Sequence, residues 1–273
     1  MVSIPRYSKR RPGAPPGFFE VEAAGLAWLA EAEEAGGVPV VRVLEVSGDG
    51  IEVERHEYQP PGPWAAEQLG RRLAVTHDAG AEWFGQPPAG WSGPGYVGTL
   101  PLPLVTKRPR SAARITSPGA WGRFYAEHRL LPFLRAARKR GVIAREDSHS
   151  VEAVCQALVD GHLAGPPEPP ARIHGDLWAD NVLWTPDGPV LIDPAAHGGH
   201  RETDLAMLDL FGLPHLDRVL AAYQEVHPLA EGWRERIALH QLHPLLVHAV
   251  LFGSGYGAQA GAMARRYVGG HRH

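Results

Sequence analysis

Cysteine is almost absent from this chain of 273 residues, since Cys155 is the only one. A single cysteine excludes an internal disulfide and fits a protein of the reducing cytoplasm. Its helically spaced apolar neighbours, Val151, Val154 and Leu158, predict a buried small residue rather than a nucleophile. The chain also lacks an apolar run of about 18 residues, which a membrane-spanning helix needs, and its amino terminus lacks the apolar core of a signal peptide.

An excess of charge of one sign is missing as well. The chain has 27 Lys and Arg residues against 30 Asp and Glu residues, with a net charge of −3. This balance provides no electrostatic basis for binding nucleic acid, whose phosphates attract strongly basic surfaces. A hydrophobic content of 44% and a charged content of 21% are ordinary for a globular protein. The composition predicts a globular protein that binds neither membranes nor nucleic acids.

Polar residues cluster between residues 173 and 194. Residues 173–181 read IHGDLWADN, and residues 191–194 read LIDP. Asp176, Asn181 and the later Asp193 have the order typical of a phosphoryl-transfer site. One carboxylate there receives the proton of an acceptor hydroxyl, while an amide oxygen and a second carboxylate hold Mg²⁺ on the nucleotide phosphates. We therefore expect Asp176 to be the catalytic base and Asn181 and Asp193 to be the metal ligands.

Short strands are expected on both sides of these residues. Residues 171–173 and 182–184 read as strands, residues 186–188 as a turn, and residues 189–192 as the return strand. The strands would present the three polar groups at one end of a small sheet. The alternative interpretation is an ordinary hairpin with loop Asp and Asn residues. An Asp five residues before an Asn is common by chance, but the complete arrangement is much more specific.

The segments HGDLW (174–178), IDPA (192–195) and HRETDLAM (200–207) resemble the fructosamine kinase, or ketosamine 3-kinase, family. That family is related to aminoglycoside, choline and protein kinases. Residues 12–26, 96–101 and 124–132 are also similar, and the resemblance covers about residues 9–268. It implies an α+β, bilobed protein-kinase-like fold. A small β-rich amino-terminal lobe with one helix would cover residues 1–60, and a larger, mostly helical lobe residues 61–273.

The resemblance implies ATP-dependent phosphorylation of a sugar hydroxyl on a ketosamine, either a small molecule or a glycated protein, with ATP and Mg²⁺ as cofactors. Lys9 occupies the place of the nucleotide lysine, with Arg10 and Arg11 as close competitors. Glu22 would pair with Lys9, and Glu20 on the same helix is its rival.

A hinge is expected at residues 54–58, where backbone groups at Glu54 and His56 would meet the adenine edge. Three further residues are expected to support the site. His174 would stabilise the catalytic loop, and Trp178 would stack on a sugar, although it could equally be packing. Asp204 would accept hydrogen bonds from loop N–H groups, although it could simply cap a helix.

Histidines raise the question of a second metal site. His197 and His200 form one group in the sequence, and His240, His243 and His248 another. Neither has a carboxylate or thiolate at a familiar zinc spacing. We therefore interpret them as core or surface histidines.

One departure from the family concerns the amino terminus. Such kinases begin with a strand, a glycine-rich turn and a second strand over the phosphates, whereas only residues 1–8 precede Lys9. A start upstream of Met1, an open phosphate site, or a truncated pseudokinase would each explain this. We favour the first, because every downstream catalytic residue is intact. Other open alternatives are an aminoglycoside or other small-alcohol phosphotransferase, and a scaffold protein.

The remaining pattern predicts the elements that surround the site. Helices are expected over residues 18–35, 63–77 and 117–140, and almost continuously from residue 202 to the end. Residues 40–46 and 51–57 are expected to be strands joined by a hairpin turn. Residues 80–116 read as a long loop rich in Gly and Pro, which could form part of the acceptor site.

Overall fold

A small antiparallel sheet forms the first part of the molecule. The computed structural model describes residues 4–110, 117 and 119–268. Its first sheet has the order β1-β3-β2 and contains β1 (Arg6–Arg10), β2 (Val43–Ser47) and β3 (Gly50–Glu54). Lys9 lies opposite Ile51 in the register. Ser47 pairs with Gly50, so a two-residue turn closes the predicted hairpin.

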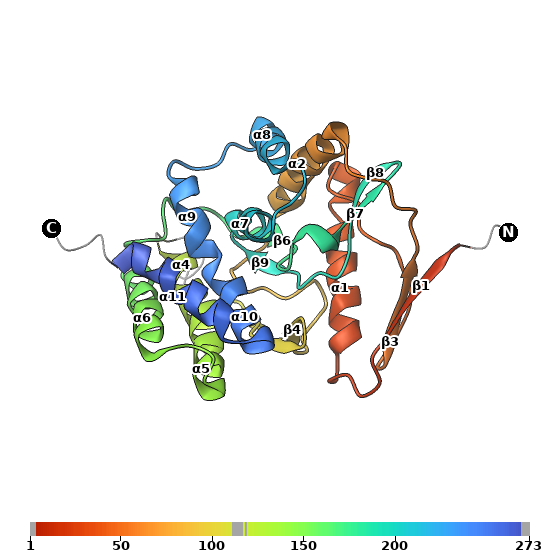
Figure 1. The fold of residues 1–273 in the computed structure, drawn as a ribbon. Helices are drawn as coiled ribbons and strands as arrows, with labels where there is room; N and C mark the ends of the chain where they lie inside the picture. Colours follow the sequence, from red (N-terminus) through yellow and green to blue (C-terminus); the bar gives the residue numbers. More distant parts are fainter. Residues whose placement is uncertain (1–3, 111–116, 118, 269–273) are drawn as a thin grey trace.

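Helix α1 (Phe18–Ala30) packs on this sheet, with Phe19 and Leu26 buried in one cluster with Ile51 and Val53. Figure 1 shows α1 standing between the β1–β3 sheet and the rest of the molecule. The helix ends before residue 35, as a separate 3₁₀ turn (Glu33–Ala35) follows it. Gly36 then adopts the left-handed conformation, with φ of 96°, that commonly ends a helix.

The polar segment folds into two short sheets rather than one. The expected hairpin is present as β7 (Val182–Thr185) and β8 (Gly188–Leu191). However, β6 (Ala171–Ile173) pairs with β9 (His197–Gly199), a strand that the sequence pattern did not predict. The expectation of a single small sheet was therefore wrong. The chain reverses at Asp193, whose φ is 56°, and then runs back beside β6. The residues after Asp193 therefore pair with β6 as β9.

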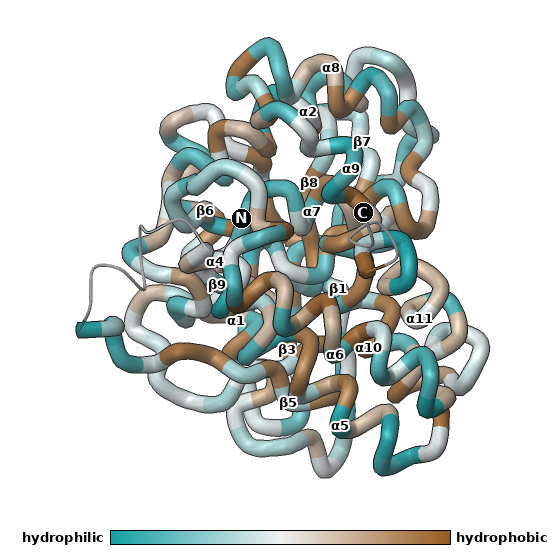
Figure 2. Tube along the Cα trace, turned by 90° about the vertical axis from the view of Figure 1, so that its left-hand side faces the viewer, coloured by the Kyte–Doolittle hydropathy of each residue, from teal (hydrophilic) through white to brown (hydrophobic). Residues whose placement is uncertain are grey.

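Helices make up most of the remaining structure. They comprise α2 (Pro63–Asp78), α4 (Ala120–Tyr125), α5 (Leu131–Arg140), α6 (Arg145–Val159), α7 (Arg201–Phe211), α8 (Leu216–Val226), α9 (Trp233–His240), α10 (Leu242–Phe252) and α11 (Ser254–Val268). In Figure 1, α2 and α8 lie together at the top, and α10 and α11 lie beside α5 and α6. Figure 2 shows hydrophobic segments running through the middle of the molecule, between the labels β8 and α10.

The predicted helix over residues 63–77 is confirmed, with Pro63 at its first turn. The predicted helix over residues 117–140 begins at Ala120 and contains a π-helical turn (Ala126–Leu130) between α4 and α5. Pro118 and residues 111–116 lie outside the described residues. The long Gly- and Pro-rich loop contains a small hairpin, β4 (Gly95–Val97) and β5 (Leu100–Leu102).

The elements match the expected α+β, bilobed kinase-like fold. Within the described residues, no helix combines the length and apolar character needed to span a membrane.

Close packing of α2 against α8 generates a stability prediction. Gly70 of α2 is buried, and a Cβ added there would overlap the Val219 carbonyl oxygen and lie 2.9 Å from the Tyr223 nitrogen. We expect Gly70→Ala to lower the free energy of unfolding by about 1 to 3 kcal/mol, because overpacking forces the backbones apart. Gly255→Ala in α11 is the matched control, since nothing lies within 4 Å of its added Cβ. Equal denaturant midpoints for the two variants would contradict the packing argument.

Candidate active site

Asp176, Asn181 and Asp193 lie around one cleft of about 600 Å³. Strand β1, helix α1 and the tip of the β4–β5 hairpin form the other walls. The lining residues include Tyr7, Ser8, Lys9, Arg10, Arg11, Phe18, Phe19, Val21, Glu22, Tyr96, Gly98, Thr99, Trp178, Pro194 and Ala195. The structure therefore brings together residues that lie more than a hundred positions apart in the chain.

Lys9 joins the amino-terminal sheet to the polar segment. Its Nζ lies 2.9 and 3.0 Å from the two carboxylate oxygens of Glu22, and 2.8 Å from Asp193 Oδ1. Burial alone would lower the pKa of Lys9, but these two carboxylates raise it above its ordinary value. The ammonium group is thus held charged at the centre of the cleft.

Glu22, rather than Glu20, is the carboxylate that meets Lys9. Glu22 is buried, and burial raises its pKa although Lys9 opposes the shift. The Oε2 atom of Glu20 is buried without a hydrogen-bond partner among the described residues. Arg10 is exposed, and Arg11 lies over the Phe18 ring, 5.1 Å from its centroid. Neither arginine therefore takes the position of Lys9.

Asp193 and Asn181 are joined across the base of the β7–β8 hairpin. The N–H of Ile192 donates to the backbone oxygen of Asn181 over 3.1 Å, so the two ends of the hairpin remain together. Asp193 follows immediately in the left-handed region. This conformation is uncommon outside glycine, and here it turns the carboxylate toward Lys9. Asn181 donates from Nδ2 to the backbone oxygen of Asp176 over 2.7 Å, which leaves its amide oxygen available as a ligand.

The Asp176 carboxylate sits among like charges. Burial, together with the neighbouring carboxylates Asp193 and Asp204, raises the pKa of Asp176 to about 7, while hydrogen bonding to Asn181 opposes the shift. A carboxylate with a pKa near neutrality is well suited to accept a proton from an alcohol.

Asp204, in the first turn of α7, anchors the loop beneath Asp176. Its carboxylate accepts hydrogen bonds from the N–H groups of His174, at 2.7 Å, and Gly175, at 2.9 Å. These are the contacts that the family resemblance implies for Asp204. Burial would raise its pKa, but hydrogen bonds and the nearby histidines hold the pKa below its ordinary value. The loop is therefore tied to a buried anion.

Two further residues extend this anchor, and the sequence analysis did not identify their role. His77 of α2 lies 3.1 Å from Asp204 Oδ2 through Nε2, and 2.8 Å from the Tyr223 hydroxyl through Nδ1. Both side chains are buried. No local sequence signal could have paired them, because His77 and Asp204 are 127 positions apart.

His174 connects the catalytic loop to the strand that leads to Asp193. Its Nε2 lies 2.8 Å from the Ile192 carbonyl oxygen, and its Nδ1 lies 3.3 Å from the Asp176 N–H. Burial lowers the pKa of His174, so the ring is neutral, donates from Nε2 and accepts at Nδ1. It therefore positions both ends of the site and is not itself directed at the reacting atoms.

A second compartment of about 510 Å³ adjoins the cleft at Tyr7, Lys9 and Asp193. Its other walls are formed by Val41, Val53, Glu54, Arg55, His56, Leu183 and Ile192. The predicted hinge residues Glu54 and His56 therefore lie beside Lys9. The Glu54 N–H donates to Arg42 O and the Arg55 N–H to Pro5 O. Among the described residues, no hydrogen bond uses the His56 N–H.

Trp178 both lines the cleft and packs against another aromatic ring, which are the two environments that the sequence suggested for it. It lines the cleft beside Asp176, and its ring also meets Phe211 edge-on, with centroids 6.0 Å apart. Across the cleft, Tyr96 donates to Pro16 O over 3.1 Å and packs on Phe18. These contacts fix the β4–β5 hairpin against α1, so Gly98 and Thr99 at its tip face the cleft.

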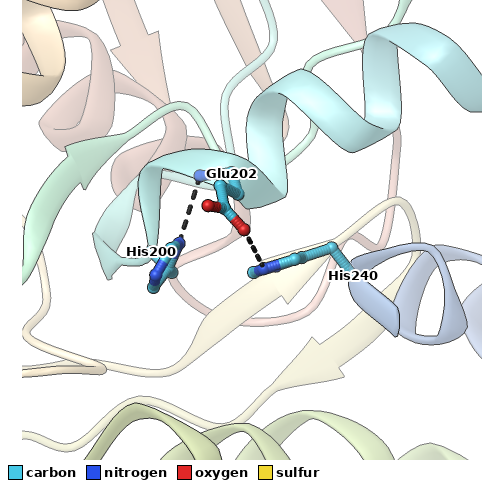
Figure 3. A group of neighbouring side chains, drawn as sticks. All are labelled: His200, Glu202 and His240. Carbon is cyan, nitrogen blue, oxygen red and sulfur yellow. Dashed lines mark hydrogen bonds and ion pairs between the residues drawn. The ribbon is translucent and has the colours of Figure 1, made fainter. Parts of the chain in front are cut away.

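His200 and His240 are buried, in agreement with their interpretation as core histidines. The ligand atoms of His200, Glu202 and His240 lie within 4.8 Å of one another, so a carboxylate does accompany these histidines (Figure 3). Both Glu202 oxygens, however, bind the guanidinium of Arg236, at 2.8 and 2.5 Å. Trp121 also stacks on His240 with centroids 4.4 Å apart. A guanidinium thus already neutralises the carboxylate, as in a structural ion pair.

Comparisons with known proteins give a consistent result. The family model for fructosamine kinase matches residues 9–269. A probable ketoamine kinase of Thermus thermophilus is 36% identical over 245 residues, covering 89% of this chain and 79% of the relative.

Solved structures show the same similarity. A protein from Thermobifida fusca, assigned as a fructosamine-3-kinase, is 52% identical, with a TM-score of 0.86 over 97% of this chain and 86% of its own. A macrolide 2′-phosphotransferase from Brachybacterium faecium is 17% identical and has a TM-score of 0.57, covering 95% of this chain and 83% of its own. The latter similarity shows the fold alone.

The raised pKa of Asp176 predicts how the stability of the protein depends on pH. Its carboxyl holds a proton up to about pH 7 when folded and loses it near pH 4 when unfolded. Folding therefore takes up a proton at Asp176, and the contribution of this one group to the free energy of unfolding falls as the pH rises between these values. Asp176→Asn removes this penalty, so its advantage over the wild type should grow from pH 4 to 7 by up to about 4 kcal/mol, then level off.

Urea unfolding at several pH values measures this difference. Asp180→Asn is the control, because it removes the same charge from an exposed position in the same loop. A stability difference for Asp176→Asn that does not change with pH would contradict the raised pKa.

Proposed function

The chain belongs to the fructosamine kinase family and is a phosphotransferase, and from this we propose that it transfers the γ-phosphoryl group of ATP to a sugar hydroxyl of a ketosamine. The observation that carries the proposal is the placement of Asp176, Asn181 and Asp193 around one cleft with Lys9. That arrangement supplies a base, two oxygen ligands and a fixed cation, which are the parts that phosphoryl transfer needs.

ATP would lie across the two compartments. The apolar side chains of Val41, Val53 and Leu183 form walls for an adenine ring, and the unused His56 N–H can donate to its edge. The phosphates would then reach Lys9 at the junction with the cleft. Glu22 orients the ammonium and keeps it charged through its ion pair. We propose accordingly that the nucleotide lobe covers residues 1–60 and the acceptor lobe residues 61–273.

Asn181 and Asp193 would hold Mg²⁺. The donor set fits, because an amide oxygen and a partly exposed carboxylate are hard oxygen ligands. When bound, the ion would neutralise charge on the phosphates and fix their orientation. Lys9 contacts Asp193 in this structure, so nucleotide binding would redirect the ammonium from that carboxylate to the phosphates.

Asp176 would orient the acceptor hydroxyl and accept its proton. The Asp204 anchor and the His174 bridge hold the Asp176 backbone in place. The proton would move from the hydroxyl oxygen to the Asp176 carboxylate as that oxygen bonds to the γ-phosphorus. The bond between the γ-phosphorus and the β,γ-bridging oxygen breaks at the same time, and ADP leaves. Most of the rate enhancement would come from positioning and charge neutralisation, because the transferring group needs little covalent help.

The acceptor would enter from the side of Trp178 and the β4–β5 hairpin tip. An indole face suits the apolar face of a sugar, and Gly98 and Thr99 at the hairpin tip are exposed. We propose that the acceptor is a ketosamine carried by a small amine or by a protein. We also propose a cytoplasmic location, because the single cysteine, Cys155, is a free buried thiol, which fits a reducing compartment.

The base assignment predicts a loss of turnover. Asp176→Asn should lower kcat by a factor on the order of 10² or more, because the general base is removed, while nucleotide binding survives. ADP release from Mg-ATP with ribulosyl-lysine or fructosyl-lysine measures this directly. Asp180→Asn serves as the matched control. Unchanged turnover in Asp176→Asn would refute the assignment, and a wild type inactive with both acceptors would refute the proposed substrate class.

The metal assignment predicts a loss of nucleotide binding. Asp193→Ala removes the anionic ligand and should abolish Mg²⁺-dependent ATP binding, measured by titration calorimetry with and without the metal. Asp187→Ala, in the turn of the same hairpin, is the control, since Asp187 lines neither compartment. Normal Mg²⁺-dependent affinity in Asp193→Ala would show that Asp193 is not a ligand.

A further inference from the structure

Arg129 is a fully buried cation outside the proposed catalytic site. Only 2% of its surface is exposed, and it is the largest of the fully buried side chains. Among the described residues, no carboxylate forms an ion pair with it; its partners are the backbone oxygens of Pro103, at 2.7 Å, and His128, at 2.9 Å, both reached by Nη1. The Phe124 ring lies under the guanidinium, 4.7 Å away. The two carbonyl oxygens and the ring face the guanidinium with partial negative charge, but none of them carries the full negative charge that would neutralise it.

The remaining donors of Arg129 are unused. Its Nε and Nη2 atoms are buried and have no hydrogen-bond partner among the described residues. They are adjacent donors on one edge of the planar guanidinium, which is the arrangement that holds one acceptor with two hydrogen bonds. Burial lowers the pKa of Arg129 to about 9, which expresses the cost of keeping an arginine charged in an apolar interior.

Arg129 also lines a small cavity. Its volume is about 10 Å³, and Arg129 lines it together with Trp121, Phe124, Tyr125, Ile173, Gly175, His197, Gly199, His200, Thr203 and His243. A space of this size holds one water-sized particle, so phosphate or sulfate would not fit. Gly175 places the cavity directly behind the loop that carries Asp176.

The local backbone is also unusual. Arg129 lies in the π-helical turn between α4 and α5. Such turns are rare and occur frequently at functional sites. Here the guanidinium is buried, whereas that of Arg135, six residues later in α5, is exposed.

We propose that this cavity binds a single monatomic anion, chloride under ordinary conditions, held by the Nε and Nη2 donors of Arg129. The anion supplies the counter-charge that the described residues lack and satisfies both donors at once. Its site joins the π-helical turn, the β6–β9 sheet and the start of α10, so occupancy stabilises the folded protein behind the catalytic loop.

Water is the competing occupant. A water molecule can accept from Arg129 and donate to the Nδ1 of His243, another buried atom without a partner among the described residues. Water, however, brings no charge and leaves the guanidinium uncompensated. The two occupants differ in one measurable respect, because only an anion makes stability depend on the identity of the salt.

Thermal unfolding of the full chain in sodium chloride, bromide and gluconate at matched ionic strength tests the proposal. The melting temperature should rise with the logarithm of halide concentration, by about 3 to 6 °C at ten times the dissociation constant, and should not rise in gluconate. Arg129→Met should abolish the halide effect, and the matched variant Arg135→Met should retain it. Equal melting temperatures in chloride and gluconate would overturn the proposal.

Bromide-soaked crystals of the wild type provide a second test that does not depend on the folding of Arg129→Met. An anomalous peak within hydrogen-bond reach of Arg129 Nε and Nη2 would support an anion site. Density there without anomalous signal at saturating bromide would identify water and overturn the proposal.

Discussion

The buried carboxylate of Asp204 is the point on which the geometry of the cleft depends. It accepts two backbone N–H groups from the loop before Asp176 and a third contact from His77. A buried charge is tolerable only when its hydrogen bonds are satisfied, so this anion forces the loop into one conformation. The Tyr223 hydroxyl holds His77 in turn, which links the loop to the packed α2–α8 pair.

The carboxylates of the cleft repel one another and are partly neutralised by Lys9. Asp176 and Asp193 repel each other, and this repulsion contributes to the raised pKa of Asp176. Lys9 offsets the charge of Asp193 while remaining paired with Glu22. A nucleotide and its metal would satisfy the same groups more completely. The free structure thus holds a site whose electrostatic strain is relieved when the proposed ligands bind.

Buried arginines have different kinds of partner within the described part of the molecule. Arg236 and Arg201 each form a two-pronged ion pair, with Glu202 and Glu168 respectively. Arg129 is buried more completely and has only carbonyl oxygens and an aromatic ring. The contrast matters because the first two arginines are neutralised by their carboxylates, whereas Arg129 keeps two unpaired donors among the described residues and lines a cavity. We therefore interpret the histidine group around Glu202 as structural, and the cavity lined by Arg129 as a binding site.

The sequence by itself determined which residues of the polar segment lie together. Asp176, Asn181 and Asp193 are joined by a turn and a hairpin, and local chain geometry suffices to bring such neighbours together. Tertiary structure alone decided the long-range contacts. Glu22 rather than Glu20 meets Lys9, β6 pairs with β9, and His77 reaches Asp204. Glu202 joins His200 and His240 in the same way. These contacts depend on how helices pack, and packing is set by the shapes of distant surfaces that no local pattern records.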